Sequence, residues 1–287
     1  MAQYVINQMD TFHGDVSFIG IPYEAFERTG HWSLWGVVRM FEAARLIGLY
    51  NGLFYYKSME GKGIGLVVIT QAVRLSPDLH RDYSLFKTLK QRYVLDIVEV
   101  GRRSFSFVTR LTNEETGQFL GEILLKYVLI DRSTRKSIPL PEAFLEKYSK
   151  HTKKEIKFRK LSIPSCPDMG KNVFKLKVLP LHSDTDRNNH VNQSGYFRFC
   201  IDCATDAALA GNYRHFTSDM CWYPVLEMNV YHANESLVNE ELVVNTWQDN
   251  EDFRLIFFII KRKDTVLFKA SFLFYPEMSK RKRNSRM

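Results

Sequence analysis

The densest group of chemically useful side chains in this chain lies between residues 183 and 196. The segment reads Ser-Asp-Thr-Asp-Arg-Asn-Asn-His-Val-Asn-Gln-Ser-Gly-Tyr and runs directly into an apolar, helix-like stretch. Such a loop can arrange an acid, a hydrogen-bond donor and a helix N-terminus around one reacting atom, as the hydrolysis of a carbonyl compound requires. One helix-capping residue would explain only one of these polar side chains.

The length and composition are those of a globular protein with one or two domains. The 287 residues are 45% apolar and 25% charged, which is ordinary for globular proteins. No apolar run reaches the roughly 18 residues of a membrane span, and the N-terminus lacks a signal peptide's basic and apolar regions. We therefore expect an intracellular protein without stable membrane insertion. Cys200 and Cys203 lack a second ligand pair, so we expect reduced packing thiols, no metal and no cofactor.

The net charge of +8 is concentrated in two places, residues 147–160 and 280–286. A basic surface can attract an acidic carrier protein, a phosphorylated cofactor or nucleic acid, although a basic run is usually a solvated linker or tail. We find no zinc-finger spacing, no RNA-binding aromatic motif and no helix-turn-helix pattern, so we expect no nucleic-acid partner.

The polar loop has a counterpart near the N-terminus. Residues 27–39 (ERTGHWSLWGVVR) align with residues 186–198 (DRNNHVNQSGYFR) at an offset of 159 residues, and the acid, both arginines, the histidine and a glycine coincide. An apolar helical pattern follows each copy, over Trp32–Tyr50 and Gln193–Leu209. Because neither pattern has a clear polar face, both helices should be buried.

β-Branched and aromatic runs joined by tight turns follow each predicted helix, and they indicate antiparallel strands. The predicted strands are Leu66–Leu75, Tyr93–Val100, Phe105–Leu111, Ile123–Ile130, Val225–His232, Glu241–Trp247, Phe253–Ile260 and Val266–Tyr275. The pattern predicts an α+β fold, a tandem (double) hotdog in which two long buried helices are each wrapped by a curved antiparallel sheet. The predicted divisions are an N-terminal repeat (1–145), a basic crossover linker (146–171), a C-terminal repeat carrying the polar loop (172–278) and a basic tail (279–287).

The motif Ser183-Asp184-x-Asp186-x-Asn188-x-His190-Val191-Asn192-x-x-x-Tyr196 resembles the signature of plant- and bacterial-type acyl-[acyl carrier protein] thioesterases. Further matches are Tyr23-Glu24, Arg28-Thr29, Glu42-Ala43-Ala44 and Thr134-Arg135-Lys136-Ser137-Ile138-Pro139, so the resemblance covers about residues 20 to 275. It implies hydrolysis of a fatty acyl thioester, with Asp186, Asn188 and His190 as the catalytic residues. It also implies that the first copy mainly shapes the acyl pocket.

A thioester hydrolase needs an activated water or nucleophile and donors for the oxyanion. We expect the oxyanion at the amino end of the second helix, near the backbone N–H groups of Val191, Asn192 and Gln193. Asp186 would act as base or nucleophile, Asn188 would orient water or carbonyl, and His190 would polarise the water. The expected acyl pocket comprises Trp32, Trp35, Met40, Phe41 and Tyr196. Alternatively, Asp186 caps the loop, His190 is a satisfied half-buried histidine, and Asn192 is the N-cap.

One position departs from the family pattern, which places an acid followed by Cys after a Tyr on the first strand beyond the helix. Here alignment from Tyr231 puts Asn234 at the acid position and Glu235 at the Cys position. Because neighbouring strand residues point to opposite faces, Glu235 replaces the acid only if a bulge re-aims it. A non-catalytic acyl- or lipid-binding hotdog protein is therefore an alternative.

A hotdog enoyl hydratase or dehydratase is a further and weaker alternative. Its D-x-N-P-x-H pattern contains a proline and places the histidine five residues after the acid, whereas His190 follows Asp186 by four residues with no proline.

The acyl group would arrive on coenzyme A or on an acyl carrier protein, and a basic surface suits both carriers. Ser285-Arg286-Met287 resembles the Ser-Lys-Leu peroxisomal address. If this tripeptide works as an address, we expect a peroxisomal protein whose substrate is an acyl-CoA. If it does not, we expect a cytoplasmic protein. The predicted assembly is a monomer, with the two repeats acting as a pseudo-dimer, or a homodimer.

Overall fold

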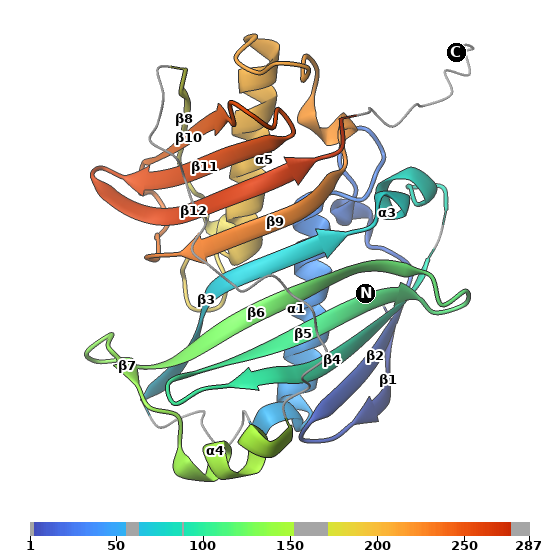
Figure 1. Ribbon diagram of the computed structural model, residues 1–287, viewed down its shortest axis with the longest axis vertical. Helices are drawn as coiled ribbons and strands as arrows, with labels where there is room; N and C mark the ends of the chain where they lie inside the picture. The colour runs from blue at the N-terminus through green and yellow to red at the C-terminus, as the bar shows by residue number, and fades with distance from the viewer. Residues whose placement is uncertain (1–2, 56–62, 88, 152–171, 277–287) are drawn as a thin grey trace.

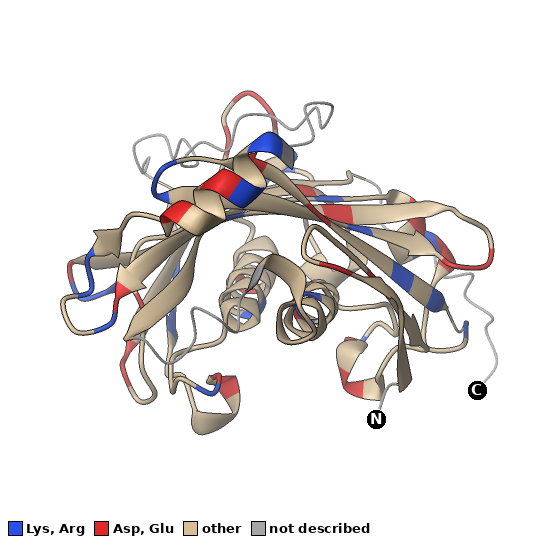
Figure 2. Cartoon of the chain, turned by 90° about the horizontal axis from the view of Figure 1, so that it is seen from below, with Lys and Arg blue, Asp and Glu red and all other residues tan. Residues whose placement is uncertain are grey.

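A single curved antiparallel sheet wraps two long helices in the computed structural model, which describes residues 3–55, 63–87, 89–151 and 172–276 (Figure 1). Viewed end-on, the sheet arches over both helices (Figure 2). The strand order is β1-β2-β4-β5-β6-β3-β9-β12-β11-β10-β8, and β7 pairs with β6. Within the described ranges, no helix has the length and hydropathy needed to cross a membrane.

The strands are β1 (Gln3–Met9), β2 (His13–Ile19), β3 (Ile64–Leu75), β4 (Lys90–Val100), β5 (Ser104–Asn113), β6 (Phe119–Asp131), β7 (Ser137–Ile138), β8 (Phe174–Val178), β9 (Val225–His232), β10 (Leu242–Gln248), β11 (Leu255–Arg262) and β12 (Thr265–Phe274). The α-helices are α1 (Leu34–Tyr50), α3 (Pro77–Asp82), α4 (Glu142–Tyr148) and α5 (Gln193–Leu209). Short 3₁₀ turns include η1 (Tyr23–Ala25), η4 (His182–Asp184) and η5 (Met220–Trp222).

The helices α1 and α5 are each 17 residues long. The first residues of the two helices are 159 positions apart in the sequence, and so are the last residues, which is the same offset as between the two loops. Each helix begins at a side-chain cap. The Gly36 N–H donates to Ser33 Oγ (3.0 Å) at α1, and the Ser194 N–H donates to Asn192 Oδ1 (2.8 Å) at α5. Because most of the circumference of each helix is apolar, both helices are buried under the sheet.

The centre of the sheet is the antiparallel pair β3–β9, in which Gln71 lies opposite Val230 and Ala72 opposite Asn229. The strand order outward from this pair is the same on both sides, β3-β6-β5-β4-β2 and β9-β12-β11-β10-β8. The eight strands predicted from the sequence correspond to β3–β6 and β9–β12. They are antiparallel as expected, and β9 has the predicted bounds.

The outer strands β1, β2 and β8 and the short helix α3 were not predicted from the sequence. In β8 lysines alternate with apolar residues, and every residue is either exposed or only partly buried, as is typical of an edge strand. In β2 the charged residue Asp15 is buried and paired with Arg92. A charged residue at a buried position breaks the apolar pattern by which a strand is predicted from sequence. The helix α4 spans the boundary between the predicted N-terminal repeat and the predicted linker. Residues 152–171 of the predicted linker, which include Cys166, and the tail with Ser285-Arg286-Met287 lie outside the described residues.

Two glycines occupy equivalent places in the first turns of α1 and α5, and they differ in the space around them. A Cβ atom on Gly36 would lie 2.7 Å from the Ala25 carbonyl oxygen, whereas one on Gly195 would lie 3.3 Å from a Val191 methyl group and 3.8 Å from the nearest backbone atom. Alanine gains up to about 1 kcal/mol in helix propensity at either position, but a backbone collision costs about 1–3 kcal/mol. We expect Gly36→Ala to lower the free energy of unfolding by about 1–2 kcal/mol and Gly195→Ala to change it little. Urea unfolding of both variants checks this, and equal losses would contradict it.

A partly buried histidine, whose Nε2 atom is shielded from solvent, gives the fold a predictable response to acid. Within the described part of the chain, His232 Nε2 has no hydrogen-bond partner, and its ring lies beside Tyr196 and Phe268. Burial, and secondarily the charge of Arg45, lowers the pKa of His232 to about 4. Between an ordinary pKa of 6.5 and this value, the unfolded chain binds a proton that the folded chain does not. Stability must therefore fall as the pH drops through this window.

The free energy of unfolding should fall as the pH drops from about 7 to 5. We expect His232→Gln to make this fall smaller by about 2 kcal/mol. Urea unfolding of the wild type and the variant at both pH values measures this difference. His182→Gln, at an exposed histidine, is the matched control. It should leave the change of the unfolding free energy with pH the same as in the wild type. Identical slopes in wild type and His232→Gln would refute the assignment.

Candidate active site

The polar loop is a tight, internally bonded turn fixed to the start of α5. The Asn192 N–H donates to the Asp184 carbonyl, and the Asp186 N–H donates to the His190 carbonyl, both at 2.8 Å. Asn189 adopts a left-handed φ of 60°, a conformation that asparagine tolerates in turns. The buried Asp184 carboxylate accepts from the Leu181 N–H (2.9 Å) and from Arg198. The backbone from 184 to 192 therefore holds its side chains in fixed directions.

The Asp186 carboxylate is turned toward its own loop. Its Oδ1 accepts from the N–H groups of Asn188 (2.7 Å) and His190 (3.4 Å), and Oδ2 lies 3.4 Å from Asn188 Nδ2. This geometry is the one expected if the Asp186 carboxylate caps its own loop. The carboxylate braces the turn that presents Asn188 and His190, both at the protein surface.

The His190 imidazole pairs with a carboxylate that follows β9. His190 Nε2 lies 3.3 Å from Glu235 Oε2, and the two side chains are 27% and 33% exposed. Arg135, in the β6–β7 hairpin of the other half, also forms an ion pair with Glu235. The sequence analysis did not assign Arg135 to the site, because only the fold brings residue 135 next to residue 235.

The Asn234 side chain, which the alignment placed at the acid position, contacts a backbone carbonyl and not His190. Asn234 is exposed, and its Nδ2 donates to the Val266 carbonyl (2.8 Å). The strand β9 ends at His232, so the alternation of side chains does not extend to Glu235. Glu235 therefore reaches His190 without the bulge that the sequence analysis required.

Two of the three predicted oxyanion donors already have partners. The Val191 N–H donates to the Ser236 carbonyl (2.9 Å), and the Asn192 N–H to the Asp184 carbonyl (2.8 Å). Among the described residues, no hydrogen bond uses the Gln193 N–H. The Gln193 amide is thus the predicted backbone donor that remains for a ligand at the α5 terminus.

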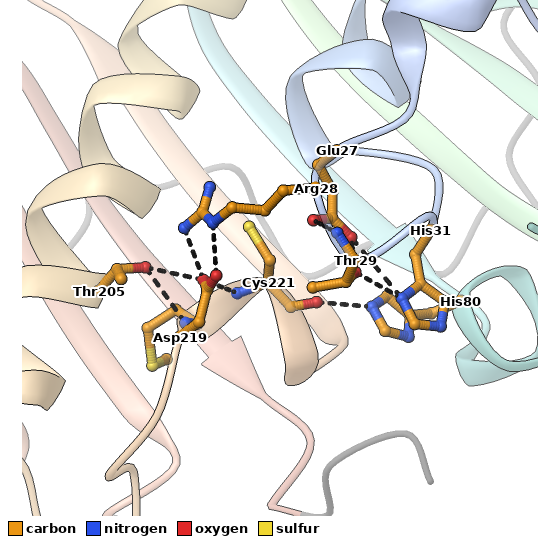
Figure 3. A network of polar contacts seen from close by, with 9 residues as sticks. Glu27, Arg28, Thr29, His31, His80, Thr205, Asp219 and Cys221 are labelled. Carbon is orange, nitrogen blue, oxygen red and sulfur yellow. Dashed lines mark hydrogen bonds and ion pairs between the residues drawn. The ribbon is translucent and has the colours of Figure 1, made fainter. Parts of the chain in front are cut away.

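The first copy of the loop has the same backbone. The Glu27 N–H donates to the His31 carbonyl (3.0 Å), the Thr29 N–H to Glu27 Oε2 (2.8 Å), and Gly30 has a φ of 81° at the position of Asn189. The side chains differ, because glutamate is one methylene longer than aspartate. Glu27 Oε1 therefore comes within 3.6 Å of His31 Nδ1, and Thr29 Oγ1 bonds to both groups (Figure 3).

A second imidazole, His80 of α3, stacks on His31 with ring centroids 4.1 Å apart and planes 15° apart. His80 Nε2 lies 3.0 Å from the Cys221 carbonyl oxygen (Figure 3). Burial, aided by the neighbouring His31, lowers the pKa of His80 to about 4, so this ring is neutral at pH 7. No sequence pattern indicated His80, which reaches His31 only through the fold.

The Glu27 carboxylate is ionised at neutral pH. Burial alone would raise the pKa of Glu27, but hydrogen bonds from His31 and Thr29 outweigh burial and lower it. Glu27, His31 and His80 offer ligand atoms within 4.8 Å of one another. An imidazole binds a metal ion in the plane of its ring, however, and two nearly parallel stacked rings cannot both point to one ion. We therefore assign no metal to this cluster.

Arg28 fastens the first loop to the other half of the molecule. Its guanidinium bonds twice to Asp219, with Nε–Oδ2 and Nη2–Oδ1 distances of 2.5 and 2.7 Å (Figure 3). Asp219 also accepts from Thr205 Oγ1 (3.2 Å) on α5 and from the Cys221 N–H (3.0 Å). A bidentate arginine–carboxylate pair fixes orientation as well as distance.

A pocket opens beside this first loop, at the amino end of α1. The space within it is about 520 Å³ when open solvent is included, of which about 50 Å³ can hold the centres of water-sized molecules. Its lining comprises Glu27, Trp32, Ser33, Leu34, Trp35, Val37, Leu75, Ser76, Leu79, His80, Ile201, Met220, Cys221, Tyr223, Pro224 and Val225.

The residues predicted to form one acyl pocket are separated by the fold. Trp32 and Trp35 line the pocket at α1, whereas Met40 and Phe41 are buried in the core. Tyr196 is also buried. Its ring stacks on Phe268 (5.2 Å), and its hydroxyl group lies 2.7 Å from Ser236 Oγ. The prediction treated helix positions as one group, although they face different sides of α1 and α5.

No protein-family model and no curated protein sequence matches this chain. Solved structures do match it over most of its length. The 12:0-ACP thioesterase from Umbellularia californica is 13% identical, with a TM-score of 0.72 over 92% of this chain and 98% of that protein. An acyl-ACP thioesterase from Bacteroides thetaiotaomicron is 15% identical, with a TM-score of 0.70 and the same coverage. The chain therefore has the hotdog-type fold that these acyl-ACP thioesterases share.

Proposed function

We propose that this protein is a hydrolase that cleaves fatty acyl thioesters, on coenzyme A or on an acyl carrier protein, to a free fatty acid and a thiol. The observation that carries the proposal is the His190–Glu235 pair (3.3 Å) at the amino end of a buried helix. The likeness of fold to acyl-ACP thioesterases supports the same reaction class. Fold alone does not establish an activity, so the site must carry the argument.

We further propose that the fold is a tandem of two hotdog units, 1–145 and 172–278. Three observations support this: the shared 159-residue offset of loops and helices, the equivalent caps Ser33 and Asn192, and the mirrored strand order around β3–β9.

In the proposed mechanism His190 is the general base. Its imidazole takes a proton from water as the water oxygen attacks the thioester carbon, and Glu235 orients the ring and stabilises the imidazolium that forms. The Gln193 N–H and the positive end of α5 stabilise the oxyanion. The carbon–sulfur bond then breaks, and the thiolate recovers the proton from His190. Asn188 orients the carbonyl group or the water, and Asp186 holds the loop.

The non-catalytic alternative depended on asparagine at position 234. The contact between Glu235 and His190 supplies an acid by another route and favours hydrolysis over simple acyl binding. The choice of carrier stays a prediction, and so does the peroxisomal address at Ser285-Arg286-Met287.

We expect His190→Ala to lower kcat about 10²–10⁴-fold, the usual contribution of a general base. Asp186→Asn should lower kcat less, because an amide oxygen can still accept the loop N–H bonds. Thiol release from acyl-CoA and acyl-carrier-protein substrates of graded chain length measures both effects and also identifies the carrier. Wild-type rates in His190→Ala, with unchanged circular dichroism, would remove the proposed mechanism.

The adjacent residues 234 and 235 offer a matched pair of variants. Glu235→Gln should lower kcat strongly and change its pH profile, because the imidazolium loses its carboxylate. Asn234→Asp should leave kcat within about twofold of wild type, because this exposed side chain faces the Val266 carbonyl. The opposite ranking would show that residue 234, and not Glu235, supplies the acid.

A further inference from the structure

We propose that Arg135, from the first half of the chain, is a positioning residue of the hydrolytic site. It holds the Glu235 carboxylate beside His190 and disfavours a proton on the His190 ring. This inference rests on the proposed function, because it concerns the same histidine–glutamate pair. It gives the first half a part in the chemistry, in addition to the acyl-pocket role that the family resemblance implies.

The hairpin that carries Arg135 is a tight, internally bonded turn between β6 and β7. The Arg135 N–H donates to the Asp131 carbonyl (2.8 Å), and the Asp131 N–H donates to the Lys136 carbonyl (3.0 Å). The Asp131 carboxylate accepts from the N–H groups of Ser133 (2.9 Å) and Thr134 (2.8 Å). These bonds fix the backbone from which the Arg135 side chain extends.

The backbone conformation at this position does not favour an arginine. Arg135 has a left-handed φ of 57°, which glycine and asparagine adopt more readily than a long side chain does. A turn that needed only its backbone would be better served by one of those two residues. The arginine is therefore explained by the contact that its guanidinium makes with Glu235 of the other half.

Arg135 and His190 share one atom of Glu235. Arg135 Nη2 bonds to Glu235 Oε2, and His190 Nε2 lies 3.3 Å from the same oxygen. The arginine side chain is 51% exposed, and an ion pair this exposed contributes little to folding. We therefore expect the guanidinium to act on the site and not on the stability of the fold.

The shared oxygen has a consequence for the proton on the imidazole. A protonated ring would place a second cation beside the guanidinium, and the two like charges repel. Arg135 therefore favours the neutral ring that a general base requires, while Glu235 still orients that ring. A carboxylate that contacted the histidine alone would stabilise the protonated ring before the reaction begins.

Three further titratable groups belong to the surroundings of the histidine–glutamate pair. Asp186 bonds to N–H groups of its own loop, and Arg187 of that loop places its guanidinium over a tyrosine ring. Tyr196 faces the glutamate, and burial raises the pKa of this phenol, so it is neutral at pH 7. The cation that shares the carboxylate oxygen with the imidazole is Arg135.

The first test removes the guanidinium and follows thioester hydrolysis by the full chain. Arg135→Met should move the acid side of the kcat/KM profile to a pH about 0.5–1 higher, because the ring then keeps its proton to a higher pH. It should lower kcat at high pH about three- to tenfold, because the carboxylate loses one of its two contacts. KM should stay within about twofold of wild type, because the arginine does not touch the substrate.

Two further variants separate the charge from its placement. Arg135→Lys keeps a cation and should return the profile toward that of the wild type. Lys136→Met, at an exposed position of the same hairpin, removes an equal charge and should behave as wild type. Arg135→Asn suits the left-handed turn and replaces Arg135→Met if that variant does not fold. A raised KM with unchanged kcat and pH profile would show that Arg135 binds the carrier, and it would overturn the proposal.

The second test does not depend on turnover. The imidazole NMR signal of His190, identified by its loss in His190→Gln, is followed against pH in the full chain. Arg135→Met should move its midpoint to a pH about 0.5–1 higher, and should move it less in a Glu235→Gln background, because the arginine is held there by the carboxylate. Equal shifts in both backgrounds, or no shift in either, would overturn the role of Arg135. Absence of hydrolysis in wild type with the NMR shift present would overturn the proposed function alone.

Discussion

The amino end of α5 is fixed from two sides at once by the side chain of Asn192. Its Oδ1 accepts from the N–H and the hydroxyl group of Ser194 in the first turn of the helix, and its Nδ2 donates to Glu42 of α1 (3.1 Å). Arg39 of α1 reaches Ser194 as well (3.0 Å). Because these groups are partly or fully buried, an unmade bond would cost about 1–3 kcal/mol. The first half of the chain thus determines where the helix terminus of the second half points.

The same interdependence recurs at both loops. Arg135 of the first half contacts Glu235 beside His190, and Asp219 of the second half holds Arg28 beside Glu27. The continuous β3–β9 pairing keeps these partners in register. Neither candidate site could be complete in an isolated half, which is the physical reason for describing the molecule as one unit despite its repeat.

The repeated backbone also shows how two sites can diverge without a change of fold. Both loops use the same hydrogen bonds, but Glu27 reaches the His31 ring while Asp186 bonds to backbone N–H groups. At equivalent positions of the two helices, Val37 lines a pocket, whereas the Tyr196 ring is buried against Phe268. The backbone is conserved between the halves by local turn geometry, whereas the chemistry depends on the length and bulk of single side chains.

The sequence by itself determined what local periodicity and capping can specify. The apolar helices, the eight inner strands and the Asn192 cap follow from patterns within short segments, because helix and strand periods are local properties. Only the tertiary structure decided which groups meet. Glu235 joins His190 because it lies beyond the end of β9, His80 joins His31 from a separate helix, and the predicted acyl residues divide between a pocket and the core. Contacts between residues tens of positions apart depend on strand register and helix packing, which no local pattern encodes.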